Sequence, residues 1–393
     1  MPGLPPPPAA RPADVLVIGG GIVGVSCAAH LAATGRQVVL LERKELAAGA
    51  SGRNSGVVQH PFDPVLVGLH LETVGLYRAL AQNGEPGLTL PAKPVGLMLV
   101  THDVALAKGL TDQLALSHPG LSPTFLGPEA AIAVEPSLAQ GVAACRLAIG
   151  YPVAPAAATR AYAAWATRLG VDIRVGASAR PWLSSGRVVG VELADGDRLP
   201  AEQVVVAAGP WTPDVIDPSG AWRPVRSLWG VVATVALPDA PIHVLEEAEI
   251  DIEPGSGPAE PGENGTASQA GHAFSLVTAV GASSLGSTFL DEEPDAAALV
   301  PSIVARGASF VPSIASAQVG AHRVCARPLS VDGRPLVGRV PGIDGLWVAA
   351  GHGPWGISTG PATGRLLADL LDGRIAAPPP ALDPGRFDGP PPR

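Results

Sequence analysis

A glycine-rich turn near the amino end sets the strongest limit on how this chain can fold. Gly19, Gly21 and Gly24 have the spacing G-x-G-x-x-G, between an apolar run at residues 14–19 and a stretch rich in small residues at 22–34. In a strand, turn and helix, the first glycine permits the tight turn and the second lets a pyrophosphate approach the backbone. The third lets helix and strand pack closely. The pattern therefore predicts a dinucleotide-binding βαβ unit.

A second apolar run, at residues 37–42, ends in an acidic residue. A carboxylate at the position of Glu42 accepts hydrogen bonds from ribose hydroxyls and disfavours a 2′-phosphate. The helix start offers free N–H groups and a partial positive charge to the phosphates. We therefore expect Ile22, Val23, Glu42 and Arg43 among the cofactor-binding residues.

The stretch after this unit favours FAD over NAD. NAD-binding chains usually continue directly into further βα units, whereas residues 47–59 read A-A-G-A-S-G-R-N-S-G-V-V-Q, small and hydroxyl residues without periodicity. Such a loop can run beside an extended cofactor and present backbone N–H groups to it. The expected cofactor contacts in this loop are Ser51, Arg53, Asn54, Ser55 and Gly56.

The remaining elements follow from periodicity and from turn residues. Asp63 and Pro64 open an apolar-faced helix that continues to Gln82, with Gly84 as its stop. Residues 188–207 predict three strands, two of them joined at Asp195-Gly196. Further helices are expected at residues 103–116, 155–169, 296–305 and 358–371, strands at 95–101, 171–175, 317–325 and 346–350, and a solvated loop at 253–271.

Composition and charge narrow the class of partner. The 393 residues are 47% hydrophobic and 16% charged, which indicates a packed interior shared by two domains. The formal charge of -9 and the scattered basic residues argue against nucleic acid as a partner. Residues 1–12 lack the pattern of a secretory signal, and the apolar stretch at 15–35 is interpreted as a buried strand and helix, not as a membrane span.

The cysteines point to a reducing compartment. Cys27, Cys145 and Cys325 are far apart, odd in number and without metal-ligand spacing, so neither disulfide bonds nor a metal site is expected. A cytoplasmic location is expected.

Several stretches, in order along the chain, resemble the FAD-dependent amine and amino-acid oxidoreductases typified by glycine oxidase, sarcosine oxidase and D-amino-acid dehydrogenase. They read D-V-L-V-I-G-G-G-I-V-G from Asp14, G-A-S-G-R-N-S-G from Gly49, V-V-V-A-A-G-P-W from Val204, R-P-L-S-V-D-G-R-P-L-V-G from Arg327 and G-L-W-V-A-A-G-H-G-P-W-G-I from Gly345. The resemblance implies an α/β fold, α+β in part, with a Rossmann-like FAD-binding domain and a second domain whose antiparallel sheet covers the flavin.

The same resemblance suggests domain boundaries. The FAD-binding domain is expected to combine residues 13–88, 146–224 and 323–376. The substrate-binding domain is expected at residues 89–145 and 225–322, and residues 1–12 and 377–393 are expected to be flexible tails.

The resemblance also implies roles for residues in the second half of the chain. Arg327 is expected to bind the substrate carboxylate through two parallel donors, which holds the reacting carbon over the flavin. His352 is expected either to polarise the substrate amine or simply to line the cavity. Further cofactor contacts are implied for Ala179, Ala208, Gly209, Trp211, Gly351, Gly353, Gly356 and Ile357.

Cys325 has two interpretations. In sarcosine oxidase a cysteine in this position, upstream of the segment that here contains Asp332, carries the flavin through a thioether. The alternative is that Cys325 is a buried residue packed behind Arg327. Cys325 is counted among the cofactor contacts in either case.

The reaction implied is loss of hydride from the carbon bearing an amine, in a small amino acid or secondary amine, to the flavin, followed by hydrolysis of the imine. The lysine that activates oxygen in sarcosine oxidase has no counterpart between Phe274 and Phe289. Either oxygen or an electron-transfer acceptor is therefore expected to reoxidise the flavin.

Two other functions are compatible with parts of the sequence. S-G-R-N-S-G-V-V from Ser51 resembles 2-hydroxy-acid oxidases, but the histidine base such an enzyme needs would be His60, which stands one place late. A non-catalytic or tRNA-modifying flavoprotein is the other alternative. The absence of a basic face and the presence of Arg327 argue against it.

Overall fold

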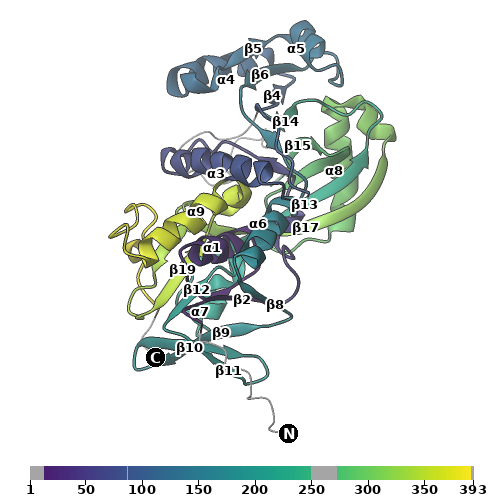
Figure 1. The fold of residues 1–393 in the computed structure, drawn as a ribbon. Coiled ribbons are helices and arrows are strands. Elements are labelled where there is room, and N and C mark those ends of the chain that lie inside the picture. The colour runs from purple at the N-terminus through teal and green to yellow at the C-terminus, as the bar shows by residue number, and fades with distance from the viewer. Residues whose placement is uncertain (1–12, 86, 249–271, 391–393) are drawn as a thin grey trace.

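The computed structural model describes residues 13–85, 87–248 and 272–390. The expected loop at 253–271 and the expected tail at 1–12 lie outside these residues. Two large sheets dominate the fold (Figure 1). The helices are α1 (Ile22–Ala33), α2 (Ala50–Arg53), α3 (Pro64–Gln82), α4 (Val104–Ser117), α5 (Pro128–Val134), α6 (Ala157–Arg168), α7 (Thr212–Ile216), α8 (Ala296–Phe310) and α9 (Gly356–Leu371).

The first sheet has six strands in the order β18-β19-β12-β1-β2-β8, and every neighbouring pair except β18 and β19 is parallel. Its strands are β1 (Val15–Ile18), β2 (Val38–Glu42), β8 (Asp172–Val175), β12 (Gln203–Val206), β18 (Leu336–Arg339) and β19 (Leu346–Ala350). Helices α1, α3, α6 and α9 pack together against one face. The carboxyl ends of β1, β12 and β19 therefore meet at one edge, where ligands of such sheets bind.

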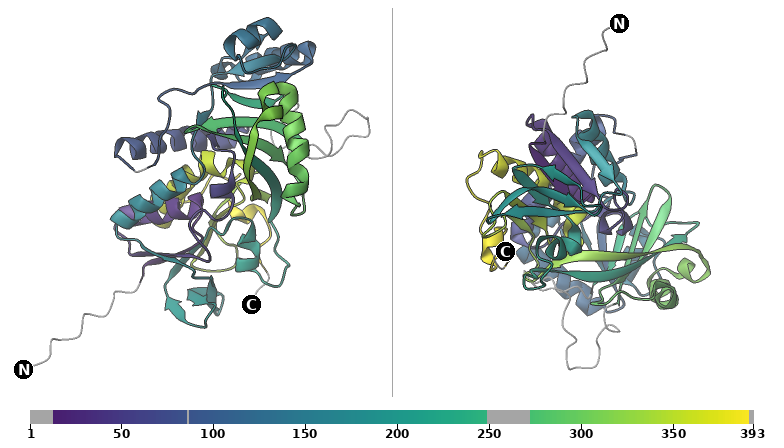
Figure 2. Two further views of the ribbon diagram at one scale, coloured as in Figure 1. Left: turned by 90° about the vertical axis from the view of Figure 1, so that its right-hand side faces the viewer. Right: turned by 90° about the horizontal axis from the view of Figure 1, so that it is seen from below.

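The second sheet has eight strands in the order β17-β13-β16-β15-β14-β4-β6-β5 and is antiparallel except between β14 and β4. Helix α8 covers its outer face (Figure 2). The strands are β4 (Leu97–Thr101), β5 (Thr124–Leu126), β6 (Ala143–Leu147), β13 (Val225–Ala236), β14 (Val244–Glu247), β15 (His272–Ala279), β16 (Ala282–Thr288) and β17 (Gln318–Ser330). The fold class expected from the sequence is confirmed.

Two small sheets complete the fold. One contains β9 (Ala179–Ser184), β10 (Arg187–Leu193) and β11 (Arg198–Pro200), and the other β3 (Val57–Val58) and β7 (Tyr151–Pro152). The predicted domain boundaries remain a prediction, and two of them fall inside strands, β6 and β17.

Local sequence signals explain several element boundaries. The Asp63 carboxylate accepts from the N–H groups of Val65, at 2.7 Å, and Leu66, so α3 begins at Pro64 as predicted. Gly196 has φ +93 in the turn between β10 and β11, which confirms the Asp-Gly hairpin. The strand expected at 317–325 continues to Ser330 because it pairs with β13 along its length.

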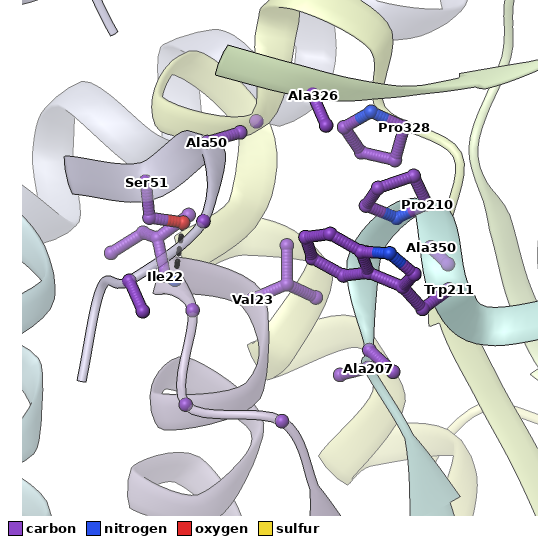
Figure 3. Close-up of a pocket in the computed structure, with 18 of the residues that line it drawn as sticks. Ile22, Val23, Ala50, Ser51, Ala207, Pro210, Trp211, Ala326, Pro328 and Ala350 are labelled. Atoms are coloured by element: carbon purple, nitrogen blue, oxygen red, sulfur yellow. Dashed lines mark hydrogen bonds between the residues drawn. The ribbon is translucent and has the colours of Figure 1, made fainter. Parts of the chain in front are cut away.

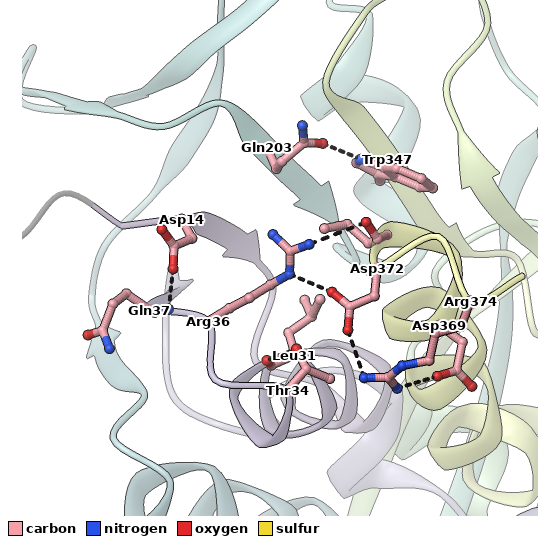
Figure 4. A network of polar contacts seen from close by, with 11 residues as sticks. Asp14, Leu31, Thr34, Arg36, Gln37, Gln203, Trp347, Asp369, Asp372 and Arg374 are labelled. Atoms are coloured by element: carbon pink, nitrogen blue, oxygen red, sulfur yellow. Dashed lines mark hydrogen bonds and ion pairs between the residues drawn. The ribbon is translucent and has the colours of Figure 1, made fainter.

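Polar contacts join the first and last helices at the far end of the six-stranded sheet (Figure 4). Arg36, just after α1, donates from Nε to Asp372, just after α9, at 2.7 Å. Trp347 of β19 donates to the Gln203 side chain of β12 at 2.6 Å. These contacts fix the packing of segments that lie far apart in the sequence.

The carboxyl-terminal segment is not the flexible tail that its proline content predicted. Leu382 is buried, and its carbonyl accepts from the Val337 N–H of β18 at 2.8 Å. Arg386 donates to both carboxylate oxygens of Asp332, at 2.7 and 3.0 Å. Proline lacks a backbone N–H donor, but the apolar side chains of this segment still have surface to bury. Residues 377–390 therefore cover the edge of the first sheet.

Among the described residues, none of the helices has the length and apolar character that a membrane span needs.

Candidate active site

A cavity of about 460 Å³ lies where the carboxyl ends of the parallel strands face β17 of the second sheet. Its wall includes the glycine turn after β1, the loop after β2, the turn after β12 and the turn before α9 (Figure 3). The volume lies within the range of small-molecule sites. The cavity is therefore placed where the sequence predicts a cofactor.

The glycine turn leaves backbone donors free at the cavity. Gly19 has φ +118, and a Cβ there would lie 2.3 Å from the Ala207 carbonyl oxygen. A Cβ on Gly24 would lie 1.9 Å from the Gly19 oxygen. The N–H groups of Gly21 and Val23 have no acceptor among the described residues, as expected of the first turn of a helix. An anionic group can accept these donors.

Glu42 turns its carboxylate toward the same turn. Its Oε2 accepts from the Gly20 N–H at 2.6 Å and its Oε1 from the Lys44 N–H at 2.8 Å. A carboxylate has further lone pairs beyond these two bonds, and Glu42 lines the cavity. The arrangement suits recognition of two ribose hydroxyls.

The loop after β2 is tied to the glycine turn. Ser51 Oγ accepts from the Ile22 N–H at 3.0 Å, so this N–H is not free for a phosphate (Figure 3). The Asn54 side chain donates to the Ser51 carbonyl at 2.7 Å and accepts from the Gly56 N–H at 2.8 Å. Asn54 therefore shapes the loop through its side chain.

An aromatic ring closes one side of the cavity. The guanidinium carbon of Arg43 lies 4.0 Å from the centroid of a Trp211 ring. A Cβ on Gly49 would lie 3.5 Å from that ring, in ordinary contact. Arg43, Gly49 and Trp211 all line the cavity.

Arg327 extends from β17 across the sheet into the cavity wall. It donates to the Thr288 carbonyl at 2.9 Å and to Ser287 Oγ at 2.6 Å. The guanidinium is buried, with its carbon 4.7 Å from the centroid of the Phe289 ring, and it meets no carboxylate among the described residues. Burial lowers its pKa from the ordinary value. A buried cation without a counter-ion is a site that an anion stabilises.

His352 lies at the turn before α9 and is buried, with 1% of its surface exposed. Its Nε2 is 3.0 Å from Thr363 Oγ1, whereas Nδ1 has no partner among the described residues. Burial lowers the pKa of His352 to about 4, so the ring is neutral at neutral pH. A neutral ring can donate or accept one hydrogen bond at the free nitrogen but carries no charge.

Cys325 is buried on the same strand as Arg327, and its Sγ lies 4.0 Å from the Ala50 carbonyl oxygen. Burial raises the pKa of this thiol, against the opposing effect of the nearby guanidinium groups of Arg327, Arg53 and Arg323. The thiol is therefore mainly protonated at neutral pH.

The cavity brings together most of the predicted site residues. Those in its wall are Gly19, Gly21, Ile22, Val23, Glu42, Arg43, Ser51, Arg53, Asn54, Ala179, Ala208, Gly209, Trp211, Cys325, Arg327, His352, Gly353, Gly356 and Ile357. Gly24, Ser55, Gly56 and Gly351 do not line it. Gly24 packs on the Gly19 carbonyl, and Gly351 turns the chain at φ +86 against Ser330.

Some lining residues were not among the predicted site residues. Trp229 comes from β13, and Glu293 comes from the segment after β16. Lys44 could have been predicted as a site residue from the sequence, because it directly follows Glu42 and Arg43. His60, the candidate base of the 2-hydroxy-acid alternative, is buried against Phe62 and His70 and is not part of the wall.

Known proteins with similar sequences and folds cover nearly the whole chain. The family model described as FAD dependent oxidoreductase, DAO, matches residues 14–370. A glycine oxidase of Pseudomonas aeruginosa is 31% identical over 385 residues, 95% of this chain and 97% of the relative. A D-amino acid dehydrogenase of a Methylobacterium species is 28% identical, covering 92% and 95%. The crystal structure of glycine oxidase from Geobacillus kaustophilus matches with a TM-score of 0.81 and 25% identity, covering 97% and 100%.

Proposed function

The chain belongs to the DAO family of FAD-dependent oxidoreductases, and from this membership we propose that it oxidises a carbon–nitrogen bond of a small amino acid or secondary amine. The relatives named glycine oxidase and D-amino acid dehydrogenase support this substrate class. The observation that carries the proposal is Arg327, a buried guanidinium in the cavity wall without a carboxylate partner among the described residues.

The cavity fits FAD. The free N–H groups of Gly21 and Val23 are donors for a pyrophosphate, and Glu42 is an acceptor for the ribose hydroxyls. Trp211 and Gly353 lie in turns that contact β17, the strand of Arg327, and the flavin ring is proposed to lie on this side of the cavity. When bound, FAD supplies the acceptor for the hydride of the substrate.

The protein contributes to the reaction mainly by holding the substrate in position. Arg327 offers parallel donors to a carboxylate, while Thr288 and Ser287 hold the guanidinium from behind. A carboxylate fixed in this way sets the height of the carbon that loses its hydride. Such placement supports an amino acid as the substrate.

The role proposed for His352 is to line the cavity as a neutral ring, which Thr363 fixes through Nε2. A neutral ring does not protonate the substrate amine, and the amine must be unprotonated to assist loss of hydride. His352 therefore does not act as an acid in the reaction.

Anaerobic titration of the purified holoenzyme tests the proposal. Glycine, sarcosine, D- and L-amino acids and 2-hydroxy acids are added separately while the visible flavin absorbance is followed. Bleaching by at least one amine is the expected result. Bleaching by 2-hydroxy acids alone would replace the proposal with the hydroxy-acid function, and admitting oxygen afterwards shows whether oxygen accepts the electrons.

A further inference from the structure

A proline interrupts helix α9 close to the cavity. The helix begins at Gly356, and Pro361 lies inside it. Proline has no backbone N–H, and its ring crowds the carbonyl group four residues earlier, so the Ile357 carbonyl loses its helical donor. The first turn of α9 is therefore joined to the rest of the helix by fewer hydrogen bonds than a regular helix would provide.

Helix α3, which packs beside α9 (Figure 1), supplies partners at this interruption. The Tyr77 hydroxyl donates to the Ile357 carbonyl at 2.8 Å, and Thr73 Oγ1 accepts from the Ala362 N–H at 3.2 Å. Thr73 and Tyr77 are four residues apart on one face of α3, and both are fully buried. Burial raises the pKa of Tyr77 well above its ordinary value, so its hydroxyl remains a donor.

The turn that Tyr77 contacts is part of the cavity wall. Gly356 and Ile357 line the cavity, and they directly follow the turn Gly353–Trp355, which contacts the strand of Arg327. The first turn of a helix carries N–H groups without helical acceptors and a partial positive charge. The orientation of this turn therefore affects how well it stabilises negative charge in the cavity.

Helix α1 fixes α9 beyond its first turn. A Cβ on Gly360 would lie 3.2 Å from the Val23 side chain, and a Cβ on Gly364 would lie 2.6 Å from the backbone carbonyl carbon of Ser26. The body of α9 is thus held closely against α1. The turn before Gly360 depends instead on its contact with Tyr77.

We propose that Tyr77 is a positioning residue for the flavin. Its hydroxyl, together with that of Thr73, replaces the hydrogen bonding that Pro361 disrupts in α9, and so holds the first turn of α9 where its N–H groups stabilise the negative charge of the reduced flavin. Tyr77 itself is not part of the cavity wall. This inference rests on the proposed function, in which the flavin ring lies on the Gly353 side of the cavity.

The direct test is the midpoint reduction potential of the bound flavin, measured anaerobically against a reference dye in the parent and Tyr77→Phe holoenzymes. The substitution removes only the hydroxyl. We expect the reduced flavin to be destabilised relative to the oxidised flavin roughly tenfold, the value of one charge-assisted contact. For a two-electron couple this is a potential about 30 mV more negative. Thr73→Val should shift the potential in the same direction.

Tyr162→Phe is the matched control. Tyr162 of α6 is buried beside Tyr77, with ring centroids 6.1 Å apart, and its hydroxyl makes no hydrogen bond to α9 among the described residues. The control removes a buried hydroxyl from the same cluster of rings and should leave the potential at the parent value. Tm is measured for both variants, because loss of a merely structural hydroxyl changes Tm and leaves the potential unchanged.

Pro361→Ala tests the physical cause. This substitution supplies a backbone N–H four residues after Ile357, so that α9 can satisfy the Ile357 carbonyl by itself. In this background Tyr77→Phe should shift the potential much less than it does in the parent. Such non-additivity is expected of two groups that serve the same carbonyl.

The outcomes separate this inference from the proposed function. A Tyr77→Phe protein with the parent potential would overturn the inference, even if its Tm falls, and so would an equal shift in Tyr162→Phe or a shift that Pro361→Ala does not diminish. If no amine reduces the flavin, the proposed reaction fails, while a shift of the potential specific to Tyr77→Phe and Thr73→Val still supports the positioning role.

Discussion

Arg327 crosses directly over Gly230 of the neighbouring strand. A Cβ on Gly230 would lie 2.3 Å from Arg327 Nη2, and the two guanidinium bonds to Thr288 and Ser287 require the arginine to pass at this point. The missing side chain of Gly230 therefore determines where the proposed carboxylate-binding group lies.

Gly230→Ala should displace the guanidinium and weaken substrate binding. We expect KM to rise roughly 10- to 100-fold, the value of a displaced charge-assisted contact, with a smaller change in kcat. Steady-state kinetics with the best amine substrate measures both. Gly320→Ala is the matched control, because a Cβ there meets nothing closer than 3.6 Å. An unchanged KM in Gly230→Ala would show that the arginine does not depend on this crossing.

Gly24→Ala should yield protein that does not retain FAD. The added Cβ would lie 1.9 Å from the backbone oxygen of Gly19, and backbone cannot move aside as a flexible side chain can. The ratio of visible to ultraviolet absorbance after gel filtration measures retention. Gly75→Ala in α3, where a Cβ meets nothing within 4 Å, should keep the colour and add up to about 1 kcal/mol of stability. A normally coloured Gly24→Ala protein contradicts the assigned turn.

Stability should fall between pH 6.5 and pH 4. Burial lowers the pKa of His30, His70 and His352 to about 4, so the unfolded chain binds protons in this window that the folded chain does not. The stabilisation is complete above pH 6.5 and is lost as pH falls. Glu246, with a raised pKa, acts in the opposite direction between pH 4.5 and 7 but is a single group.

Urea unfolding at pH 7, 6 and 5 measures this dependence. His30→Phe keeps a ring against Trp165 and should make the slope shallower. A slope that is unaltered in the variant would mean that His30 is not buried in its neutral form.

Acid precipitation should release the yellow colour from the protein into the supernatant. Burial raises the pKa of the Cys325 thiol, and thioether formation requires a thiolate. Cys325→Ser should accordingly retain FAD as the parent chain does. Colour that remains in the parent precipitate, and is lost in the serine variant, would establish the covalent bond instead.

Sequence alone predicted the parts of the site where local geometry requires particular residues. A tight strand-to-helix turn requires Gly19, Gly21 and Gly24, and Asp63 with Pro64 marks a helix start through backbone donors alone. Such signals depend only on residues that are neighbours in sequence, so they can be recognised without knowledge of the fold.

The remainder depended on contacts between distant segments. Gly230 has no local signal, because it is the passage of Arg327 over the next strand that requires a glycine there. Glu246 and Glu247 look alike in sequence, and only the position of α8 shows that it is Glu247 that pairs with Arg306. Likewise, the proline content predicted a flexible carboxyl-terminal segment, whereas this segment packs against the rest of the chain and buries Leu382.

Whether Arg327 holds an amino acid's carboxylate beside FAD is best measured by anaerobic reduction of the parent and Arg327→Met proteins. We expect a yellow protein whose colour is bleached by an amino acid, with roughly 100-fold more substrate needed in the methionine variant. Equal substrate requirements in a variant that still binds FAD, or a folded parent protein that takes up no FAD, would contradict it.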